Sequence, residues 1–438
     1  MLRTLTRAGA AGLALLTPVA AFAQEAAEAA APVANPGNNA WMMTSTILVL
    51  MMILPGLALF YGGLTRSKNM LSTMTQIGAI TCLAMLVWVT YGYGLAFGPE
   101  GNQFISWGKF FLAGVTSDST AATFSDEVIS EYVFICFQMT FAAITAALVL
   151  GATVERIKFS AVMVFAVIWL TIVYFPIAHM VWAGGGRFFE MGALDFAGGT
   201  VVHINAGVSA LVAALILGKR KGYPAEPMPP HSLTLTMVGT GLLWVGWFGF
   251  NAGSELEADG TAGLAMINTF VATAAAALAW MGAERAMGHK ASALGFCSGV
   301  IAGLVAVTPA AGNVGVFGAI ALGAIASVAC FYAVSKLKPR LGYDDALDAF
   351  GIHGIGGMIG AIGTGIFHDA ALGGPGGDLS LVDQTLVQLN ATVTTIVWAA
   401  VGTAIAIYAA KLLTGLRVSE ETEFEGLDIG EHGERAYN

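Results

Sequence analysis

The feature that most constrains this chain is a series of eleven nearly uncharged apolar segments. Each is close to the roughly 20 residues that an α-helix needs to cross a bilayer. Charges and Gly/Pro clusters separate them. The segments are 41–63, 69–97, 130–154, 159–183, 196–218, 231–253, 260–283, 291–308, 314–335, 346–368 and 386–411. Only 11% of the 438 residues are charged, against about 25% in soluble domains. We therefore expect an all-α polytopic membrane protein with eleven transmembrane helices and no soluble domain.

The first residues have the pattern of a secretory signal peptide. Arg3 and Arg7 precede the apolar stretch 8–21, and Ala-Phe-Ala at 21–23 offers small residues where a signal peptidase reads. The alternative is a membrane anchor, but the stretch is short, contains a proline and is followed at once by polar residues. We expect residues 1–23 to be cleaved off as a signal peptide.

The basic residues predict the orientation of the helices. Of 19 lysines and arginines, 15 lie at alternate junctions or at the C-terminal end. These are Arg66, Lys68, Arg156, Lys158, Lys219, Arg220, Lys221, Arg285, Lys290, Lys336, Lys338, Arg340, Lys411, Arg417 and Arg435. The remaining junctions hold only Lys109 and Arg187. Because basic loops stay on the cytoplasmic side, we expect a multi-pass protein with its N-terminus outside and its C-terminus in the cytoplasm.

Several classes of function are disfavoured by composition and motifs. The net charge of −9 provides no cationic face for nucleic acid. Cys82, Cys136, Cys297 and Cys330 lie singly in apolar segments, which predicts packing roles and neither disulfides nor a zinc site. We expect no metal and no cofactor. A membrane enzyme is disfavoured, since the chain contains nothing like a nucleophile elbow, a P-loop or a metal-binding cluster.

Two histidines inside apolar segments share one sequence frame. His203 follows Asp195 in the fifth segment and His353 follows Asp345 in the tenth, and both frames read D-x7-H-x3-G. Five segments separate the copies, and an odd offset reverses the direction of a helix. The repeat therefore predicts two inverted five-helix halves plus an eleventh helix. Counted from its aspartate, each histidine falls about two turns past the start of its helix.

Inverted halves bring corresponding residues together near the bilayer midplane. A neutral imidazole has one donor and one acceptor, so a facing pair can pass a small polar molecule or a proton along an apolar tube. The alternative is that each histidine only bonds a neighbouring helix, and the repeated frame makes this less favoured. Metal binding is also disfavoured, because no third ligand appears at helical spacing.

Other polar residues in these segments have structural interpretations. Asp195 and Asp345 could act as proton relays, but a carboxylate at a helix start can also cap backbone N–H groups, and we favour capping. His179 has no repeated frame and is interpreted as structural. Small residues such as Gly207 and Gly360 predict close approach of helix backbones.

Together with the two histidine frames, further motifs resemble those of the Amt/Mep/Rh family of ammonium transporters, specifically its bacterial Amt branch. The likeness covers nearly the whole chain after the signal peptide. The motifs are Phe137-Gln138-Met-Thr-Phe141, Ala178-His179-Met-Val-Trp182, Gly246-Trp-Phe-Gly-Phe250-Asn-Ala-Gly-Ser254, and the tail Glu425-Gly-Leu-Asp-Ile-Gly-Glu-His-Gly-Glu-Arg-Ala-Tyr437. Single aromatic residues are more often packing, so only this motif context gives them weight.

The resemblance implies a homotrimer in the bacterial inner membrane, surrounded by lipid, with one pore in each subunit. It assigns Phe141, Trp182 and Ser254 to ammonium recruitment, and Phe141 and Phe250 to a phenylalanine gate. The twin pore histidines are His203 and His353. Supporting roles fall to Asp195, as a carboxylate needed for conduction, to Gln138, which adjoins the vestibule, and to Asp345.

These residue types suit ammonium chemistry. Aromatic faces attract a cation, by about 2 kcal/mol or more when it is desolvated, and a serine hydroxyl accepts an ammonium N–H. Potassium has no N–H to donate. A charged ion loses several kcal/mol in a dry apolar tube, whereas ammonium that gives up its proton continues as ammonia. The hypothesis is recruitment, deprotonation and conduction of ammonia past the histidines with proton co-transfer; methylammonium is a candidate analogue. The alternative is an ammonium sensor with little flux that signals through a PII-type partner.

Two segments have open interpretations. If 1–23 is removed, 24–416 is the transporter domain and 417–438 is a tail. The tail is acidic, so it could be plainly solvated. The resemblance instead implies a regulatory tail on the cytoplasmic face, with reversible block by a trimeric PII-type nitrogen-regulatory protein. The length and the Arg-Phe-Phe-Glu sequence of the segment Arg187–Met191 are not expected in every relative, so this segment could alter the vestibule.

Overall fold

Eleven helices of membrane-spanning length make up most of the part of the chain that the structure describes. The computed structural model describes residues 32–437, so the predicted signal peptide lies outside the described residues. The helices are Pro36–Leu64, Ser67–Phe97, Glu131–Ala152, Phe159–Glu190, Gly199–Leu217, Leu233–Glu255, Gly260–Ala286, Ala293–Ala310, Val316–Leu341, Phe350–Phe367 and Leu381–Thr414. The prediction of an all-α membrane protein with eleven spans is confirmed, whereas the inverted relation of its halves stays a prediction.

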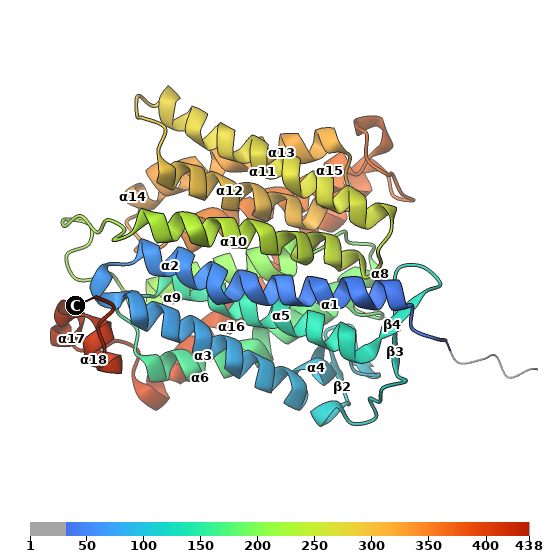
Figure 1. Cartoon of the computed structure of the whole chain (residues 1–438), viewed down its shortest axis with the longest axis horizontal. Helices are drawn as coiled ribbons and strands as arrows, with labels where there is room; N and C mark the ends of the chain where they lie inside the picture. The colour runs from blue at the N-terminus through green and yellow to red at the C-terminus, as the bar shows by residue number, and fades with distance from the viewer. Residues whose placement is uncertain (1–31, 438) are drawn as a thin grey trace, which may run out of the picture. The chain divides into compact units, whose positions relative to one another are not determined.

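Figure 1 shows the α-helical parts of these spans running side by side. They are α1 (Pro36–Met51), α2 (Ala58–Leu64), α3 (Met70–Val87), α4 (Tyr93–Phe97), α5 (Glu131–Val149), α6 (Phe159–Trp169), α7 (Phe175–Trp182), α8 (Arg187–Glu190), α9 (Asn205–Leu217), α10 (Leu233–Ala252), α11 (Gly260–Ala286), α12 (Ala293–Val307), α13 (Val316–Tyr332), α14 (Lys338–Leu341), α15 (Ile355–Phe367) and α16 (Leu381–Thr414). Two short helices, α17 (Glu420–Glu425) and α18 (Leu427–His432), form the tail.

Short π-helical and 3-10 segments interrupt or extend these helices. The π-helical segments are η1 (Met52–Leu57), η3 (Trp88–Gly92), η6 (Leu170–Tyr174), η7 (Gly199–Ile204), η10 (Ala333–Leu337) and η11 (Phe350–Gly354). The 3-10 segments are η2 (Ser67–Asn69), η4 (Phe110–Leu112), η5 (Leu150–Ala152), η8 (Gly253–Glu255), η9 (Thr308–Ala310) and η12 (Ala370–Leu372). π-Helical turns are frequent at functional sites, and His203 and His353 lie in such turns, in η7 and η11.

The two histidine helices begin later than the sequence predicts. The fifth helix starts at Gly199 and the tenth at Phe350. His203 and His353 therefore lie in the first turn, and the expectation of two turns is wrong. The reason is that each aspartate caps from several residues upstream: the Asp195 carboxylate accepts N–H groups as far along as Val201, and that of Asp345 reaches Phe350.

The connection between the second and third spans adds small strands that the sequence analysis did not predict. β1 (Glu100–Asn102) pairs antiparallel with β2 (Ile105–Trp107), with Glu100 opposite Trp107. β3 (Thr120–Ala122) pairs with β4 (Val128–Ser130) in the same way, with Thr120 opposite Ser130. His179 contacts this region, because its ring nitrogens lie 2.8 Å from the carbonyl oxygen of Ala96 and 2.7 Å from that of Asn102. Its structural interpretation is confirmed.

The helices that carry the histidines approach each other through glycines. A β-carbon on Gly207 would meet the backbone of Gly354, and one on Gly357 would lie 3.0 Å from the β-carbon of His203. A β-carbon on Gly360 would lie 2.4 Å from the carbonyl oxygen of Ala306. The prediction of close helix approach is therefore confirmed.

The prediction that the four cysteines have packing roles holds for two of them. Cys297 and Cys330 are buried, whereas Cys82 and Cys136 are exposed and are not explained by packing inside the chain.

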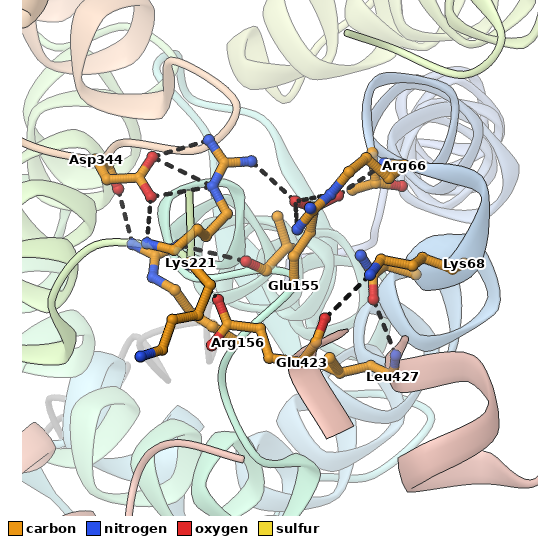
Figure 2. Close-up of polar contacts among 12 residues, drawn as sticks. Arg66, Lys68, Glu155, Arg156, Lys221, Asp344, Glu423 and Leu427 are labelled. Atoms are coloured by element: carbon orange, nitrogen blue, oxygen red, sulfur yellow. Dashed lines mark hydrogen bonds and ion pairs between the residues drawn. The ribbon is translucent and has the colours of Figure 1, made fainter. Parts of the chain in front are cut away.

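A buried ionic network ties together the loops at one end of the helix bundle, which we call the basic face and define by Arg66, Arg156, Arg220 and Lys338. The Glu155 carboxylate lies 2.9 Å from Nη2 of Arg66 and 2.9 Å from Nη1 of Arg220. Nη2 of Arg220 lies 2.8 Å from Oδ1 of Asp344. Figure 2 shows Arg66, Glu155 and Asp344 on separate segments that converge.

The arginines keep the buried carboxylates of this network ionised. Burial raises the pKa of Glu155, but Arg220 and Arg66 outweigh it and hold that pKa below its ordinary value. The pKa of Asp344 is lowered by Arg220 and Arg156 in the same way, against the effect of burial. Arg156 donates to the backbone oxygens of Gly218 at 2.8 Å and Asp344 at 2.7 Å. The network therefore holds several loops in one arrangement.

The C-terminal tail docks on the basic face. The buried Glu423 carboxylate accepts the Lys221 N–H at 2.7 Å and pairs with Arg417 at 2.7 Å. The Asp428 carboxylate accepts the backbone N–H of Ser72 at 2.7 Å and that of Leu71 at 3.1 Å, at the start of α3. A plainly solvated tail is therefore excluded, and Figure 2 shows Glu423 and Leu427 beside the ionic network.

Substitution of Gly207 by alanine is expected to destabilise the fold. The added β-carbon meets the Gly354 backbone, and such overpacking costs about 1–3 kcal/mol. We expect a clear fall in the melting temperature in detergent. Gly78→Ala is the control, because no atom lies within 4 Å of its new β-carbon and alanine is the better helix former. Equal stability of the two variants would contradict the close helix approach.

Glu423→Gln is expected to loosen the tail. The substitution leaves Arg417 and the Lys221 N–H with a weaker acceptor, and breaking a buried ion pair is strongly destabilising. Hydrogen exchange over 420–432 should accelerate by about tenfold or more. Glu425→Gln on the same short helix is the control, since Glu425 is exposed. If both variants exchange alike, Glu423 does not hold the tail in place.

Candidate functional site

A cavity of about 380 Å³ opens at the end of the bundle opposite the basic face, and we call it the aromatic cavity. α10 leads to it: His231, just before this helix, bonds Thr65 on the basic face, whereas Ser254, just after it, lines the cavity. The wall includes Phe137, Gln138, Phe141, Trp182, Asp195, Ser254 and Glu255. The structure thus brings together residues that the sequence analysis took from four separate segments.

The floor of the aromatic cavity is a pair of stacked phenyl rings. The ring centroids of Phe141 and Phe250 lie 4.1 Å apart with an interplanar angle of 11°. The edge of Trp182 packs against Phe141, with a centroid distance of 5.7 Å and an angle of 82°. Both phenylalanines are buried. The pair lies between the aromatic cavity, which Phe141 lines, and the next cavity, which Phe250 and the two histidines line.

Hydrogen-bond acceptors surround these aromatic faces. The Ser254 hydroxyl donates to the Phe250 carbonyl at 2.8 Å, so its lone pairs stay open to a ligand. Oε1 of Gln138 is buried without a donor among the described residues. Trp182 cannot accept, and its Nε1–H is used by the Asp195 carbonyl at 2.9 Å. Aromatic faces combined with free acceptors suit a small cation that carries N–H groups.

His203 and His353 lie in direct contact beneath the phenyl pair. Their Nδ1 atoms are 3.3 Å apart and their ring centroids 5.3 Å apart. Both side chains are buried. They line a cavity of about 10 Å³, which is close to the minimum that holds one water molecule. Leu57, Val202 and Ile301 complete an apolar lining in which the imidazoles are the ionisable groups.

Thr308 and Trp247 orient the histidine pair, and the sequence analysis assigned no role to either. The Thr308 hydroxyl donates to the Leu304 carbonyl at 2.7 Å and accepts from Trp247 Nε1 at 2.9 Å. Its second lone pair faces Nε2 of His203 at 3.3 Å, which favours a proton on that nitrogen. Nδ1 of His203 then accepts from Nδ1 of His353, leaving Nε2 of His353 bare.

A third cavity, of about 430 Å³, lies on the basic face. It is lined by Arg220, Lys338 and Asp348, among others, and Phe60 belongs to both this cavity and the small histidine cavity. The three cavities follow one another through the bundle. The cavities are therefore wide at both ends and narrow in the middle, where the lining is apolar apart from the histidines and Trp247.

The two aspartates act as caps, as the sequence analysis favoured. The Asp195 carboxylate accepts from the backbone N–H groups of Gly198 at 2.9 Å, Thr200 at 2.9 Å and Val201 at 3.2 Å, and also from Gly199. Burial raises the pKa of Asp195, although these bonds oppose the shift. Asp345 accepts from Ala349 at 3.0 Å and Phe350 at 2.8 Å. Burial raises its pKa to about 6, against the opposing charge of Lys338. Both carboxylates position the first turn that carries a histidine.

The segment Arg187–Met191 does contribute to the aromatic cavity. Its short helix α8 buries Phe188 and presents Phe189 to the cavity. Glu255 also lines the cavity, and the sequence analysis missed it because the quoted motif ends at Ser254. Among residues 32–437, no group of three His, Cys, Asp or Glu residues is placed to hold a metal ion.

Comparison with known proteins agrees with this geometry. The sequence profile described as the Ammonium Transporter Family matches residues 40–437. This chain belongs to the ammonium transporter family. It is 48% identical over 410 residues to the ammonium transporter of Aquifex aeolicus, covering 92% of this chain and 94% of that protein. Identity to the Bacillus subtilis ammonium transporter is 47% over 407 residues, covering 92% and 98% of the two chains.

Solved structures share the fold of this family member. A structure titled "Sensor Amt Protein" superposes with a TM-score of 0.82 at 29% identity, covering 90% of this chain and 98% of the other. The crystal structure of Candida albicans Mep2 gives 0.81 at 36% identity, covering 89% and 87%. The family is therefore shown by both sequence and fold, and the chain is a multi-pass membrane protein.

Asp195→Asn is expected to destabilise this family member and to reduce its transport activity. Both carboxylate oxygens of Asp195 accept backbone N–H groups, whereas an asparagine amide has only one acceptor oxygen. Loss of a helix cap costs about 0.5–2 kcal/mol. The melting temperature in detergent measures the first effect and uptake of labelled methylammonium the second. Asp259→Asn is the control, because Asp259 accepts only the Ala262 N–H at the start of α11. Equal losses in both variants would exclude a special role for Asp195.

Proposed function

We propose that this protein is a channel-like transporter that takes up ammonium and conducts ammonia past the histidine pair. The observation that carries this proposal is the contact between His203 and His353 in a narrow apolar cavity, directly below the Phe141–Phe250 stack. Ammonium binds in the aromatic cavity by cation–π attraction and by donating N–H groups to Ser254 and Gln138. Near the phenyl rings it passes a proton to the histidine pair or associated water and continues as ammonia.

The dry middle section supplies selectivity in this proposal. Burying an isolated cation in an apolar environment costs far more than burying a neutral amine. Potassium cannot shed its charge, so it stops at the aromatic cavity, whereas ammonium can leave its proton behind. A proton accepted by one ring can move across the Nδ1–Nδ1 contact while the other ring releases its own, so the pair can relay a proton. This supports coupled transfer of ammonia and a proton.

We further propose the setting in which this transport operates. The positive-inside rule supports an orientation in the bacterial inner membrane with the basic face and the C-terminus in the cytoplasm and the N-terminus outside. The family resemblance supports a homotrimer with one pore in each subunit. The docked tail, 417–438, is proposed as a regulatory segment beside a surface for a PII-type protein. Residues 1–23 are proposed as a cleaved signal peptide and 24–416 as the transporter domain.

The second candidate function is an ammonium sensor with little flux. The likeness to a structure titled "Sensor Amt Protein" favours keeping this alternative. A sensor would show ligand-dependent release of a partner or rearrangement of the tail without substantial uptake. A transporter would accumulate labelled methylammonium rapidly in cells that carry the chain. The two candidates therefore predict different flux for the same occupancy.

The decisive experiment records currents evoked by ammonium pulses in proteoliposomes. We expect an ammonium-specific current from the intact protein that falls by about a hundredfold or more in His203→Ala/His353→Ala, since a lost general acid–base group typically costs 10²–10⁴-fold. His179→Gln is the control, because His179 bonds backbone oxygens outside the pore. Potassium serves as the control cation.

Each outcome of this experiment separates the candidates. A current that survives in the double variant would contradict the proposed role of the histidines. An intact protein with no current but with internal alkalinisation would conduct neutral ammonia. An intact protein with neither signal would fit the sensor.

A further inference from the structure

We infer that Lys338 is a positioning residue, whose ammonium group holds the turn that carries His353 in place. This inference rests on the proposed function, because it assigns Lys338 a part in aligning the histidine pair. Nζ of Lys338 donates to Oδ1 of Asp348 at 2.6 Å and to the backbone carbonyl of Asp345 at 2.7 Å. Both acceptors lie in the loop 342–349, which leads directly into η11. One side chain therefore fixes two points of the loop immediately before the histidine turn.

The other histidine frame shows why such a contact is needed. Three residues after its aspartate comes Gly198, whose φ is 111°, a conformation that glycine adopts without steric cost. In the frame of His353 the same position is Asp348, with a φ of 61°. A left-handed backbone is unfavourable for a residue with a side chain, although aspartate tolerates it better than most. Such a conformation persists where the surroundings impose it, and here the ion pair with Lys338 does so.

The cap of the His353 turn also has fewer bonds than its counterpart. The Asp195 carboxylate accepts from four backbone N–H groups and one hydroxyl group. Among the described residues, the Asp345 carboxylate accepts from two N–H groups, that of Ala349 on Oδ1 and that of Phe350 on Oδ2. Because each oxygen serves one N–H group, protonation of either oxygen takes an acceptor from the turn. The turn therefore depends more on the ionised form of its cap and on further contacts such as that of Lys338.

The charges of Lys338 and Asp348 act on this cap in opposite directions. Burial raises the pKa of Asp345 to about 6, the positive charge of Lys338 lowers it, and the negative charge of Asp348 raises it. Removal of Lys338 alone leaves the Asp348 charge uncompensated, so the Asp345 pKa rises and the cap is protonated at a higher pH. Removal of both charges largely cancels. Lys338 thus keeps the cap in its ionised form as well as fixing the loop.

Other titratable groups around Asp345 do not change charge in the same pH range. Tyr61, on α2, and Tyr343, in the same loop, lie within its electrostatic influence, but phenols ionise far above the range in which a carboxyl group titrates. The adjacent Asp344 is paired with Arg220 at 2.8 Å, and its pKa is held below the ordinary value. A change in the protonation of the loop near neutral pH is therefore assigned to Asp345.

The ion pair lies beside the proposed path of the substrate. Lys338, Asp348 and Ile352 line the cavity on the basic face. Ile352 directly precedes His353, which lines the next cavity. The Lys338 side chain is 15% exposed, so water screens the pair only in part. A displacement of the loop would move His353 relative to His203, whose Nδ1 is 3.3 Å from its own.

Four variants separate the two parts of this role. Lys338→Met removes the contact and the positive charge. Asp348→Gly removes the negative charge and places at this position the residue type of the other frame. The double variant Lys338→Met/Asp348→Gly removes both charges but keeps a backbone that accepts a positive φ. Lys338→Arg keeps the charge and the donors, and Lys336→Met is the control, because Lys336 lies on the same segment and is exposed.

The first measurement is an infrared pH titration of the full-length protein in proteoliposomes. It follows the C=O band of the protonated Asp345 carboxyl group, which is assigned by its loss in Asp345→Asn. We expect the midpoint to rise by about one pH unit in Lys338→Met and to fall in Asp348→Gly. The double variant, Lys338→Arg and Lys336→Met should titrate close to the intact protein.

The second measurement is the initial rate of methylammonium uptake at saturating concentration over a range of pH. Well above the titration midpoint, the rate of Lys338→Met should fall about three- to thirtyfold, as for a misplaced functional group. The double variant should recover to within about twofold of the intact protein, because glycine holds the turn without the ion pair. The pH of half-maximal rate should shift in the same order as the infrared midpoints.

The outcomes distinguish the inference from the proposed function. A Lys338→Met protein with the rate of the intact protein overturns the positioning role. A rate that falls equally at every pH, without recovery in the double variant, also overturns it, since this result indicates a general loss of structure. An intact protein without uptake refutes the proposed function, whereas an infrared midpoint that ignores Lys338 refutes its link to Asp345 whether or not the protein transports.

Discussion

The cost of dehydrating a charge governs the rest of this structure. Between the stacked rings of Phe141 and Phe250 and the cavity on the basic face, the path narrows to an apolar section in which the described polar groups are two imidazoles and their supporting hydroxyl. An ion would lose most of its hydration there, so crossing in the charged form is costly. The features at either end become intelligible from this constraint. Acceptors and aromatic faces gather where an ion is still hydrated, and basic and acidic side chains gather where hydration resumes.

Holding two imidazoles in contact in such a section requires unusual helix geometry. Each histidine lies on a first turn of π-helical form, and a buried aspartate several residues upstream binds the free N–H groups of that turn. The two turns can meet because the residues at their crossing have no side chain, with Gly207 against the backbone of Gly354. Thr308 then selects one arrangement of ring protons through its bonds to Leu304 and Trp247. The proton-bearing groups are therefore positioned by backbone geometry as much as by side chains.

The sequence predicts the parts of this arrangement that depend on composition and repetition. Eleven uncharged segments follow from the length of a bilayer-spanning helix, and the meeting of His203 and His353 follows from a repeated frame. Helix starts could not be read, because a carboxylate that caps from four or more residues upstream looks in sequence like a helix residue. Thr308 was equally hidden, since its role depends on a turn between two apolar segments. The docking of the tail depends on backbone N–H groups far away in the sequence, those of Ser72 and Lys221. Every residue except proline has such a group, so the sequence does not indicate which ones the tail binds.

The way the tail docks also has a consequence for the biogenesis of the protein. Glu423 and Asp428 are synthesised after all eleven spans, yet they bind the backbone at Lys221, in a loop, and at Ser72, at the start of α3, which are made long before. These N–H groups are brought together only when spans from the beginning, middle and end of the chain have been inserted and assembled. The tail can therefore dock only after the helix bundle has assembled. A truncated or misassembled chain would leave its last helices unbound and open to proteases, so this contact distinguishes complete molecules from incomplete ones.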